Sequence, residues 1–439
     1  MLEGGGESVR AENAEAETAS LTYVEPESLF AQCTAAIGTR ANVRLLRWDF
    51  LDDRARRLAL ATTDAERAAL ALPRRQDLER DHPAAFYSLD ELQALPRGNK
   101  AFAGGPLPLV AVSYCWRSAA HPDPFGQALV RFAAAVRHAQ RHRAQRHNAL
   151  LPKAVAVFFD WCSLDQKDAQ GNRTDQERAS FQGALASMQL WYAHQLTTVF
   201  MMTDPATDPA SDTLVDSLSY GARGWPTESR CAMLGKRTSQ HAWPLLVDVA
   251  ALGSDAGRTE AGLAPRYPPL RPDEFHALLA TKRFTNGADA ELVANLYTAT
   301  AREVIGGASM LKFGGLQWGD AELVELCAWL PHCQKLRTLS LVGNRIGDGG
   351  IRALAAVVAS GGLQQLCDLN IGSNVISDRG GRALLKAIEA GHFPAMTKLE
   401  THGNRDLSEL MRTRLREALR ALDRERAARA RVRTSSGNN

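Results

Sequence analysis

The chain has 439 residues, of which 45% are hydrophobic and 23% are charged, and its formal net charge at pH 7 is +3. This length exceeds what one hydrophobic core usually serves, so we expect two or three domains. The composition is that of a globular chain, no apolar run is long enough to span a bilayer, and so small a positive excess argues against a nucleic-acid partner.

The chain begins with a segment, residues 1–20, that contains mostly Gly, Glu and Ala and has almost nothing to bury, which predicts disorder. Its composition matches neither a secretion signal nor a transit peptide. Seven cysteines are scattered without a CxxC pair, which predicts reduced thiols and no metal site. Together these features predict a cytoplasmic protein.

Residues 21–105 are expected to be a helical region that leads into the next domain. From Arg44 to Leu72, apolar residues recur three and four positions apart, the spacing of amphipathic helices, and Pro73 then interrupts the pattern. The residues of this region indicate no function.

Residues 106–247 contain three apolar runs with the character of buried parallel strands, separated by stretches of helical composition. Alternating strands and helices predict an open, mostly parallel α/β sheet with right-handed crossovers. In such sheets ligands bind outside the carboxyl ends of the strands. The side chains expected at those ends are Ser113, Tyr114, Asp160, Trp161 and Asp204.

Four strings in this segment occur in the order SYCW, FFDWCSLDQ, MQLWYAH and YGARGWPTESR. In this order they resemble the heterokaryon-incompatibility (HET) domain, which is regarded as similar in fold to Toll/interleukin-1 receptor (TIR) domains. The resemblance covers residues 106–236. It implies a TIR/flavodoxin-like sheet, self-association through this domain, and a role in recognition and signalling.

The resemblance also implies an enzymatic alternative. In TIR enzymes a glutamate is credited with cleaving the bond between nicotinamide and the ribose of NAD, and its counterpart here is Glu228. NAD would then be a substrate, and no cofactor is expected. Glu228 follows Trp225 by three residues, whereas both families place the glutamate four after the tryptophan. We therefore favour a scaffold over an enzyme. The substrate-binding residues of the alternative are Ser113, Tyr114, Asp160, Trp161 and Trp225.

These residues have structural interpretations as well. Trp225 fits a core aromatic, Ser113 fits the cap of a helix or turn, and Asp160 fits a carboxylate that bonds backbone groups in the loop after its strand. The sequence leaves both interpretations open.

After an expected linker with a helix over residues 248–300, the sequence repeats itself over residues 301–411. Asn344, Asn374 and Asn404 recur 30 residues apart, and leucine ladders keep step with them. In such a repeat a short strand supplies the leucines, the asparagine bonds backbone groups at the turn, and a helix returns along the outside. The pattern resembles leucine-rich repeats of the ribonuclease-inhibitor type and implies a protein-binding module.

Residues 412–439 predict a helix that covers the open end of the stack, followed by a basic tail. Two alternatives to protein binding stay open for the repeats. So short a stack could merely shield the α/β domain, since repeat arrays need several units for stability. Repeats of this type also resemble those of Ran GTPase-activating proteins, so a GTPase regulator is a further, less favoured hypothesis.

Overall fold

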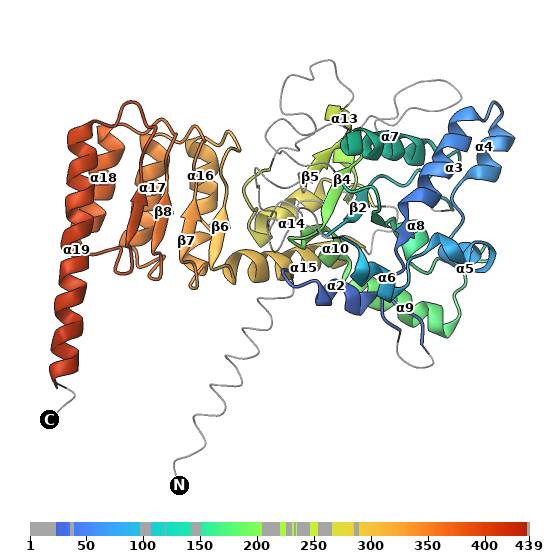
Figure 1. Ribbon diagram of the computed structural model, residues 1–439, viewed down its shortest axis with the longest axis horizontal. Helices are drawn as coiled ribbons and strands as arrows, with labels where there is room; N and C mark the ends of the chain where they lie inside the picture. Colours follow the sequence, from blue (N-terminus) through green and yellow to red (C-terminus); the bar gives the residue numbers. More distant parts are fainter. Residues whose placement is uncertain are drawn as a thin grey trace, which may run out of the picture. The chain divides into compact units, whose positions relative to one another are not determined.

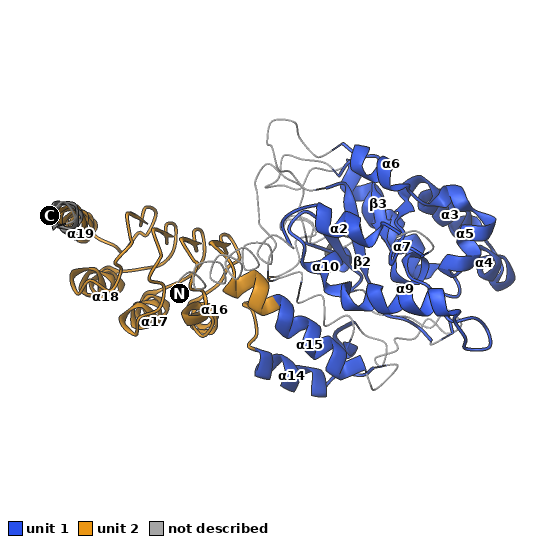
Figure 2. Ribbon diagram, turned by 90° about the horizontal axis from the view of Figure 1, so that it is seen from below, with its two compact units in different colours: residues 1–264, 272–300 blue, residues 265–271, 301–439 orange. Residues whose placement is uncertain are grey.

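The computed structural model describes residues 23–35, 39–96, 107–118, 120–141, 151–203, 220–224, 231, 234, 246–252, 266–284 and 289–436. The chain divides into two compact units, the first of residues 1–264 and 272–300 and the second of residues 265–271 and 301–439 (Figure 2). No helix within the described ranges is both long enough and apolar enough to cross a membrane. The predicted disordered segment, residues 1–20, lies outside them.

A five-stranded sheet forms the centre of the first unit (Figure 1). Its order is β1-β3-β2-β4-β5, with β2 to β5 parallel and β1 antiparallel to β3. The parallel strands therefore run second, first, third, fourth in chain order, as in flavodoxin-like doubly wound sheets. This confirms the predicted open, mostly parallel α/β sheet. The strands are β1 (Leu46–Arg47), β2 (Leu109–Ser113), β3 (Ala156–Phe158), β4 (Thr198–Met201) and β5 (Leu246–Asp248).

Both faces of this sheet are buried, which explains why its strands are continuous apolar runs. Successive strand residues point to opposite faces. Val110 and Phe200 belong to one core cluster with residues of α3 (Trp48–Leu60) and α7 (Gln127–Arg141). On the opposite face, Phe158 stacks on Trp191 of α10 (Met188–Ala193), with ring centroids 4.9 Å apart.

The helical region before β2 is an integral part of the first unit. Besides the edge strand β1, it contributes Trp48, Leu51 and Leu58 of α3 to the core cluster. The sequence predicted only helix here, because a strand of two residues is too short for a period-two pattern. The other helices that the structure describes in this unit are α2 (Glu27–Gln32), α4 (Asp64–Leu70), α5 (Arg75–Asp81), η1 (Pro83–Ala85), α6 (Leu89–Ala94), α8 (Asp160–Ser163), α9 (Asp175–Ala186), η3 (Tyr220–Ala222), α13 (Val249–Leu252), α14 (Pro272–Ala280) and α15 (Asp289–Ala301).

The second unit is a stack of strand–helix repeats. Its four strands pair in parallel and in chain order, so that Leu311, Leu339, Leu369 and Leu399 are aligned side by side. Figure 2 shows the helices in a row along one side of the unit. The predicted short leucine-rich stack is confirmed. Its elements are η4 (Arg302–Gly306), β6 (Met310–Lys312), α16 (Asp320–Cys327), η5 (Leu330–His332), β7 (Thr338–Ser340), α17 (Asp348–Ala359), β8 (Asp368–Asn370), α18 (Asp378–Glu389), β9 (Lys398–Glu400) and α19 (Glu409–Ser436).

Both ends of the stack are covered by segments of the same unit. At the last repeat, α19 packs against α18 and buries Met411 and Leu415. At the first repeat, the indole of Trp318 donates a hydrogen bond of 2.8 Å to the carbonyl of Arg266. The Arg266 guanidinium in turn donates to the carbonyl of Lys312, at 2.8 Å. Capped ends of this kind keep a repeat core from water.

Each repeat asparagine is buried and links two repeats through the backbone. The Asn344 Oδ1 accepts from the amides of Leu316 and Trp318, at 2.8 and 3.2 Å. Its Nδ2 donates to the carbonyls of Phe313 and Leu341, at 2.7 and 2.9 Å. One side chain thus pairs backbone groups that neither repeat could pair alone. Equivalent bonds are made by Asn374 and Asn404.

We expect Asn374→Ala to lower the free energy of unfolding of the repeat unit by about 2–4 kcal/mol, because it leaves the buried amide of Ile346 without an acceptor. Pulse proteolysis in urea, read on peptides of the repeats, measures this. Arg345→Ala, a change at an exposed neighbour, is the control and should stay within about 0.5 kcal/mol. Equal effects of the two changes would show that the asparagine bonds are dispensable.

Candidate functional site

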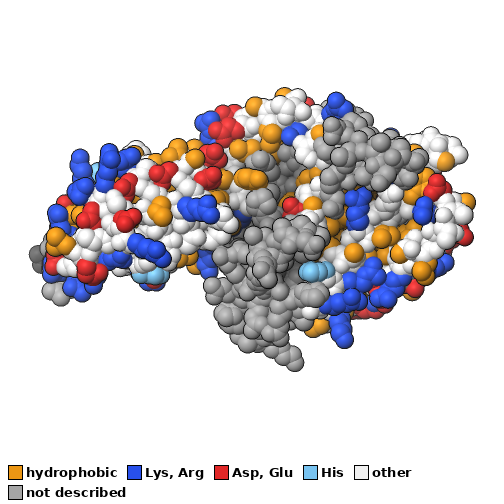
Figure 3. All heavy atoms as spheres, turned by 90° about the horizontal axis from the view of Figure 1, so that it is seen from above, with side chains coloured by type: hydrophobic (Ala, Val, Ile, Leu, Met, Phe, Trp, Pro, Cys, Tyr) orange, Lys and Arg blue, Asp and Glu red, His pale blue; other side chains and the backbone are white. Residues whose placement is uncertain are grey.

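The open face of β6 to β9 is the first candidate site. Alternate strand residues point away from the leucine core, and the parallel register aligns them across the sheet. One row consists of Lys312, Ser340, Asn370 and Glu400, and a second consists of Met310, Thr338, Asp368 and Lys398. The face is therefore mostly polar and carries charges of both signs. Figure 3 shows acidic and basic side chains interspersed over this unit.

The last two strands hold a small network on this face. The Asn370 amide donates to Glu400 at 2.7 Å, and Lys398 pairs with Glu400 and, at 3.6 Å, with Asp368. The hydrogen bond from Lys398 lowers the pKa of Glu400, and the same contact raises the pKa of Lys398. By contrast, no hydrogen bond of the Thr338 or Ser340 hydroxyl is found among the described contacts. The face therefore offers fixed charges beside hydroxyl groups that a ligand can reach.

A ladder of aspartates, which was not predicted from the sequence, fixes the turns at the starts of the repeat helices. The Asp320 carboxylate accepts from the amides of Gly347 and Gly349, at 2.7 and 3.1 Å. Asp348 and Asp378 act in the same way one and two repeats later. Each aspartate thus occupies the amide-rich start of the next repeat's helix, where negative charge is favoured. The recurrence of aspartate with the repeat period was the signal that could have revealed it.

The aspartate ladder also explains one glycine at the start of each of the helices α17 and α18. A Cβ atom at Gly380 would lie 2.6 Å from the Asp348 carboxylate, too close for any real contact. A Cβ atom at Gly349 would meet Asp320 in the same way. A side chain at either position would therefore crowd the turn, and the crowding group is the carboxylate of the preceding repeat.

The carboxyl edge of the first unit's sheet is the second candidate site. Of the predicted residues, the structure brings Tyr114 and Asp160 together, because the Tyr114 hydroxyl donates to the Asp160 carboxylate at 2.7 Å. The indole of Trp116 donates to the other oxygen at 2.8 Å, and the amide of Trp161 donates at 2.6 Å. Burial raises the pKa of Asp160, while these donors act to lower it. The Asp160 carboxylate thus accepts three hydrogen bonds from groups of its own fold, and these bonds order the loop that follows β3.

The other predicted residues occupy different places. Trp161 is buried, and its indole donates to the carbonyl of Leu72 at 2.9 Å. Ser113, at the end of β2, shares a hydrogen bond of 2.7 Å with the Tyr220 hydroxyl. Ser113 pairs with Met201 of β4, so it lies at the border of β2 and β4, where the strand order reverses and such sheets bind ligands. Three predicted residues lie outside the described ranges: Asp204, Trp225 and Glu228.

No group of His, Cys, Asp and Glu side chains suited to a metal ion occurs among the residues that the structure describes. Two thiols are held in the protonated form: burial raises the pKa of Cys115 to about 11 and that of Cys333 to about 12. A thiol with so high a pKa is protonated at neutral pH, which disfavours nucleophilic attack.

Comparison with protein families supports the assignment of leucine-rich repeats. A family model described as leucine-rich repeat matches residues 332–355 and 366–385. A solved structure of leiomodin-1 actin-binding site 2 (ABS2) is similar at 17% sequence identity, over 29% of this chain and 88% of that one, with a TM-score of 0.23. No curated protein matches the chain. These comparisons give no support to the TIR and HET resemblance, which stays a prediction.

We expect Asp160→Asn to destabilise the first unit by about 1–3 kcal/mol. The substitution replaces one accepting oxygen by an amide nitrogen, which cannot accept a hydrogen bond from Tyr114 or Trp116. The loss should depend on pH. Since burial raises the folded pKa of Asp160 above its unfolded value, the wild type loses stability as the pH rises above about 4 through the folded pKa, and the variant does not.

Urea unfolding of the two proteins at several pH values, followed by far-UV circular dichroism, measures this difference. The difference in the free energy of unfolding between wild type and variant should be largest at acidic pH and should decrease as the pH rises. Asp53→Asn, a change at an exposed aspartate of α3, serves as the control and should give no gap. A gap that widens with pH would contradict the assigned pKa direction.

Proposed function

We propose that the repeat unit binds another protein through the open face of β6 to β9, and that the chain is a cytoplasmic recognition and signalling protein. The observation that carries this proposal is the aligned polar face on a sheet whose turns are fixed. Because asparagines and aspartates hold every turn, the face loses little conformational entropy when a partner binds. Pre-ordered side chains of this kind favour specific recognition.

The chemistry of the face indicates what the partner offers. Glu400 and Asp368 supply acceptors, Lys398 supplies a cation, and the hydroxyls of Thr338 and Ser340 can donate or accept. Four short strands, spaced by about 4.8 Å, span a width suited to one segment of a partner rather than to a whole domain. We propose a polar segment with charges of both signs.

The first unit would act beside the repeats. The flavodoxin-like strand order and the polar side chains at the carboxyl edge are compatible with the TIR/HET-like domain that the sequence resembles. In this proposal the repeats bind the partner, and the first unit transmits the signal by self-association. The bonds of Asp160 to Tyr114 and Trp116 favour this scaffold over catalysis, since they commit the carboxylate to the fold.

Site-specific photo-crosslinking tests the binding face. A crosslinking amino acid at Ser340 or Asn370 should capture one and the same partner, because both positions face away from the leucine core. The same group at Arg352 of α17 or Arg382 of α18, exposed on the helices, is the matched control and should not capture it. Adding charge with Ser340→Arg should lower the yield at Asn370 about tenfold or more. Capture from the helix positions alone would contradict the proposal.

A second candidate function is hydrolysis of NAD with Glu228 as the catalytic carboxylate. It draws on Ser113, which lies where the strand order reverses. Water would replace nicotinamide at the ribose carbon, so the reaction releases nicotinamide. If the proposal holds, release is seen with the wild type and falls about 100-fold or more in Glu228→Gln. Glu389→Gln, a change on α18, should leave it unaltered. Absence of release at any protein concentration would exclude this function.

A further inference from the structure

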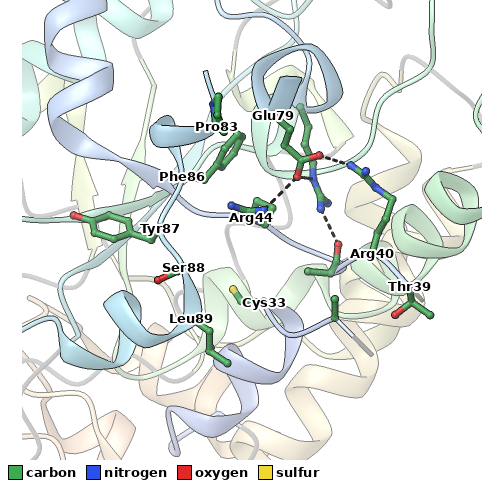
Figure 4. Close-up of a pocket in the computed structure, with 13 residues that line it drawn as sticks. Cys33, Thr39, Arg40, Arg44, Glu79, Pro83, Phe86, Tyr87, Ser88 and Leu89 are labelled. Atoms are coloured by element: carbon green, nitrogen blue, oxygen red, sulfur yellow. Dashed lines mark hydrogen bonds and ion pairs between the residues drawn. The ribbon is translucent and has the colours of Figure 1, made fainter. Parts of the chain in front are cut away.

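The first unit contains a pocket of about 440 Å³ that neither candidate site includes (Figure 4). It lies in the part of the chain that precedes β2, among residues of α5, the start of α6, and the segments that follow α2 and η1. Its volume is within the range of about 300–1,000 Å³ that is usual for small-molecule sites. Three arginines and one glutamate line it: Arg40, Arg44, Arg75 and Glu79.

Arg75 forms a rigid wall of this pocket. Its side chain is 1% exposed and donates to the backbone carbonyls of Ala41 and Asn42, at 2.9 and 3.1 Å. It also pairs with Glu79 at 3.1 Å. Burial lowers the pKa of Arg75, and the nearby carboxylates oppose this effect. Because its donors are directed at partners within the fold, Arg75 positions the wall and is not available to a ligand.

Arg40 is committed in a similar way. Its guanidinium makes two hydrogen bonds to the fully buried carboxylate of Asp165, at 2.8 and 3.2 Å, and a further ion pair with Glu79. Burial acts to raise the pKa of Glu79, but Arg75 and Arg40 lower it below its usual value. Two arginines and two carboxylates therefore neutralise each other within the wall.

Arg44 is the remaining cation, and it is differently placed. Its Nη1 lies 3.7 Å from the already shared carboxylate of Glu79, and its guanidinium lies over the ring of Phe86, 5.0 Å from the centroid. Among the contacts of the described residues, this guanidinium makes no hydrogen bond. Figure 4 shows Arg44 in the middle of the pocket, between Glu79 and Cys33. Burial raises the pKa of Cys33 to about 12, so the neutral thiol cannot balance the charge.

We propose that this pocket binds a small organic anion whose carboxylate or phosphate group pairs with Arg44. Three guanidinium groups against two carboxylates leave one positive charge, and the Arg44 side chain is 33% exposed, so an anion that enters the pocket can reach it. The ring of Phe86 holds the guanidinium plane, which favours two parallel hydrogen bonds to a flat or tetrahedral anion. Leu89 at the start of α6 offers an apolar contact to the rest of the ligand.

This binding site is independent of the proposed functions. It shares no residue with the open face of the repeats or with the carboxyl edge of the sheet. A negative binding result for this pocket therefore does not bear on the proposed protein-binding face of the repeats. Failure of the crosslinking experiment likewise does not bear on the proposed anion site.

Isothermal titration calorimetry on the full chain at low salt tests the site. The probes are benzoate and phenyl phosphate, with benzamide as the neutral counterpart of benzoate. We expect one-to-one binding of at least one anion, weakened by added salt, and no binding of benzamide. Saturation by benzoate alone identifies a carboxylate ligand, and saturation by phenyl phosphate alone identifies a phosphate ligand. If neither anion binds, or if benzamide binds as tightly, the proposal is overturned.

Two changes at Arg44 and one control place the site. Arg44→Gln should weaken anion binding about 10- to 100-fold, because it removes a charge-assisted pair. Arg44→Lys keeps the charge and the fold but loses the paired donors, so an intermediate loss is expected. Arg47 also stacks on an aromatic ring, that of Tyr87, but it does not line the pocket. The Arg47→Gln variant should therefore bind the anion as the wild type does. Unchanged binding in both Arg44 variants would assign the anion to another place.

Discussion

The stack of repeats depends on one constraint, that a buried backbone amide must have a partner. The tight turn after each strand leaves amides unpaired within its own repeat, and the asparagine of the next repeat accepts from them. The aspartate ladder repeats this principle at the helix starts. Since every turn is completed by a neighbour, no repeat is whole alone, and the open face has one geometry.

The first unit meets the same constraint with charged groups. Asp160 accepts from two aromatic side chains and one amide, and Arg75 donates to carbonyls of the segment before β1. Both groups are costly to bury unless fully paired, so each fixes the chain around it. Where pairing is complete, as at Asp160, the role is structural. At Arg44 the pairing is incomplete, so its guanidinium can still form hydrogen bonds with a ligand.

Local patterns in the sequence revealed three of the five strands of the first unit's sheet, β2, β3 and β4, and the repeat asparagines. These features rest on periodicity and on spacing within one unit. The partners of Asp160 and the pocket around Arg44 could not be predicted, because they join residues far apart in the chain, such as Arg40 and Asp165. The strand β1 was missed because its two residues carry no pattern. The aspartate ladder was visible in the repeat spacing but not interpreted.

Amide hydrogen exchange of the free protein tests the central claim most directly, because it reports whether the turns beside the binding face are held. The amides of Ile346 and Ile376, which donate to Asn374 and Asn404, should exchange only when the whole repeat unit opens. Their rates should then match those of the core strand residues Leu339 and Leu369. Rapid exchange at these two amides, with the strands still protected, would contradict an account in which asparagines hold the face in one geometry.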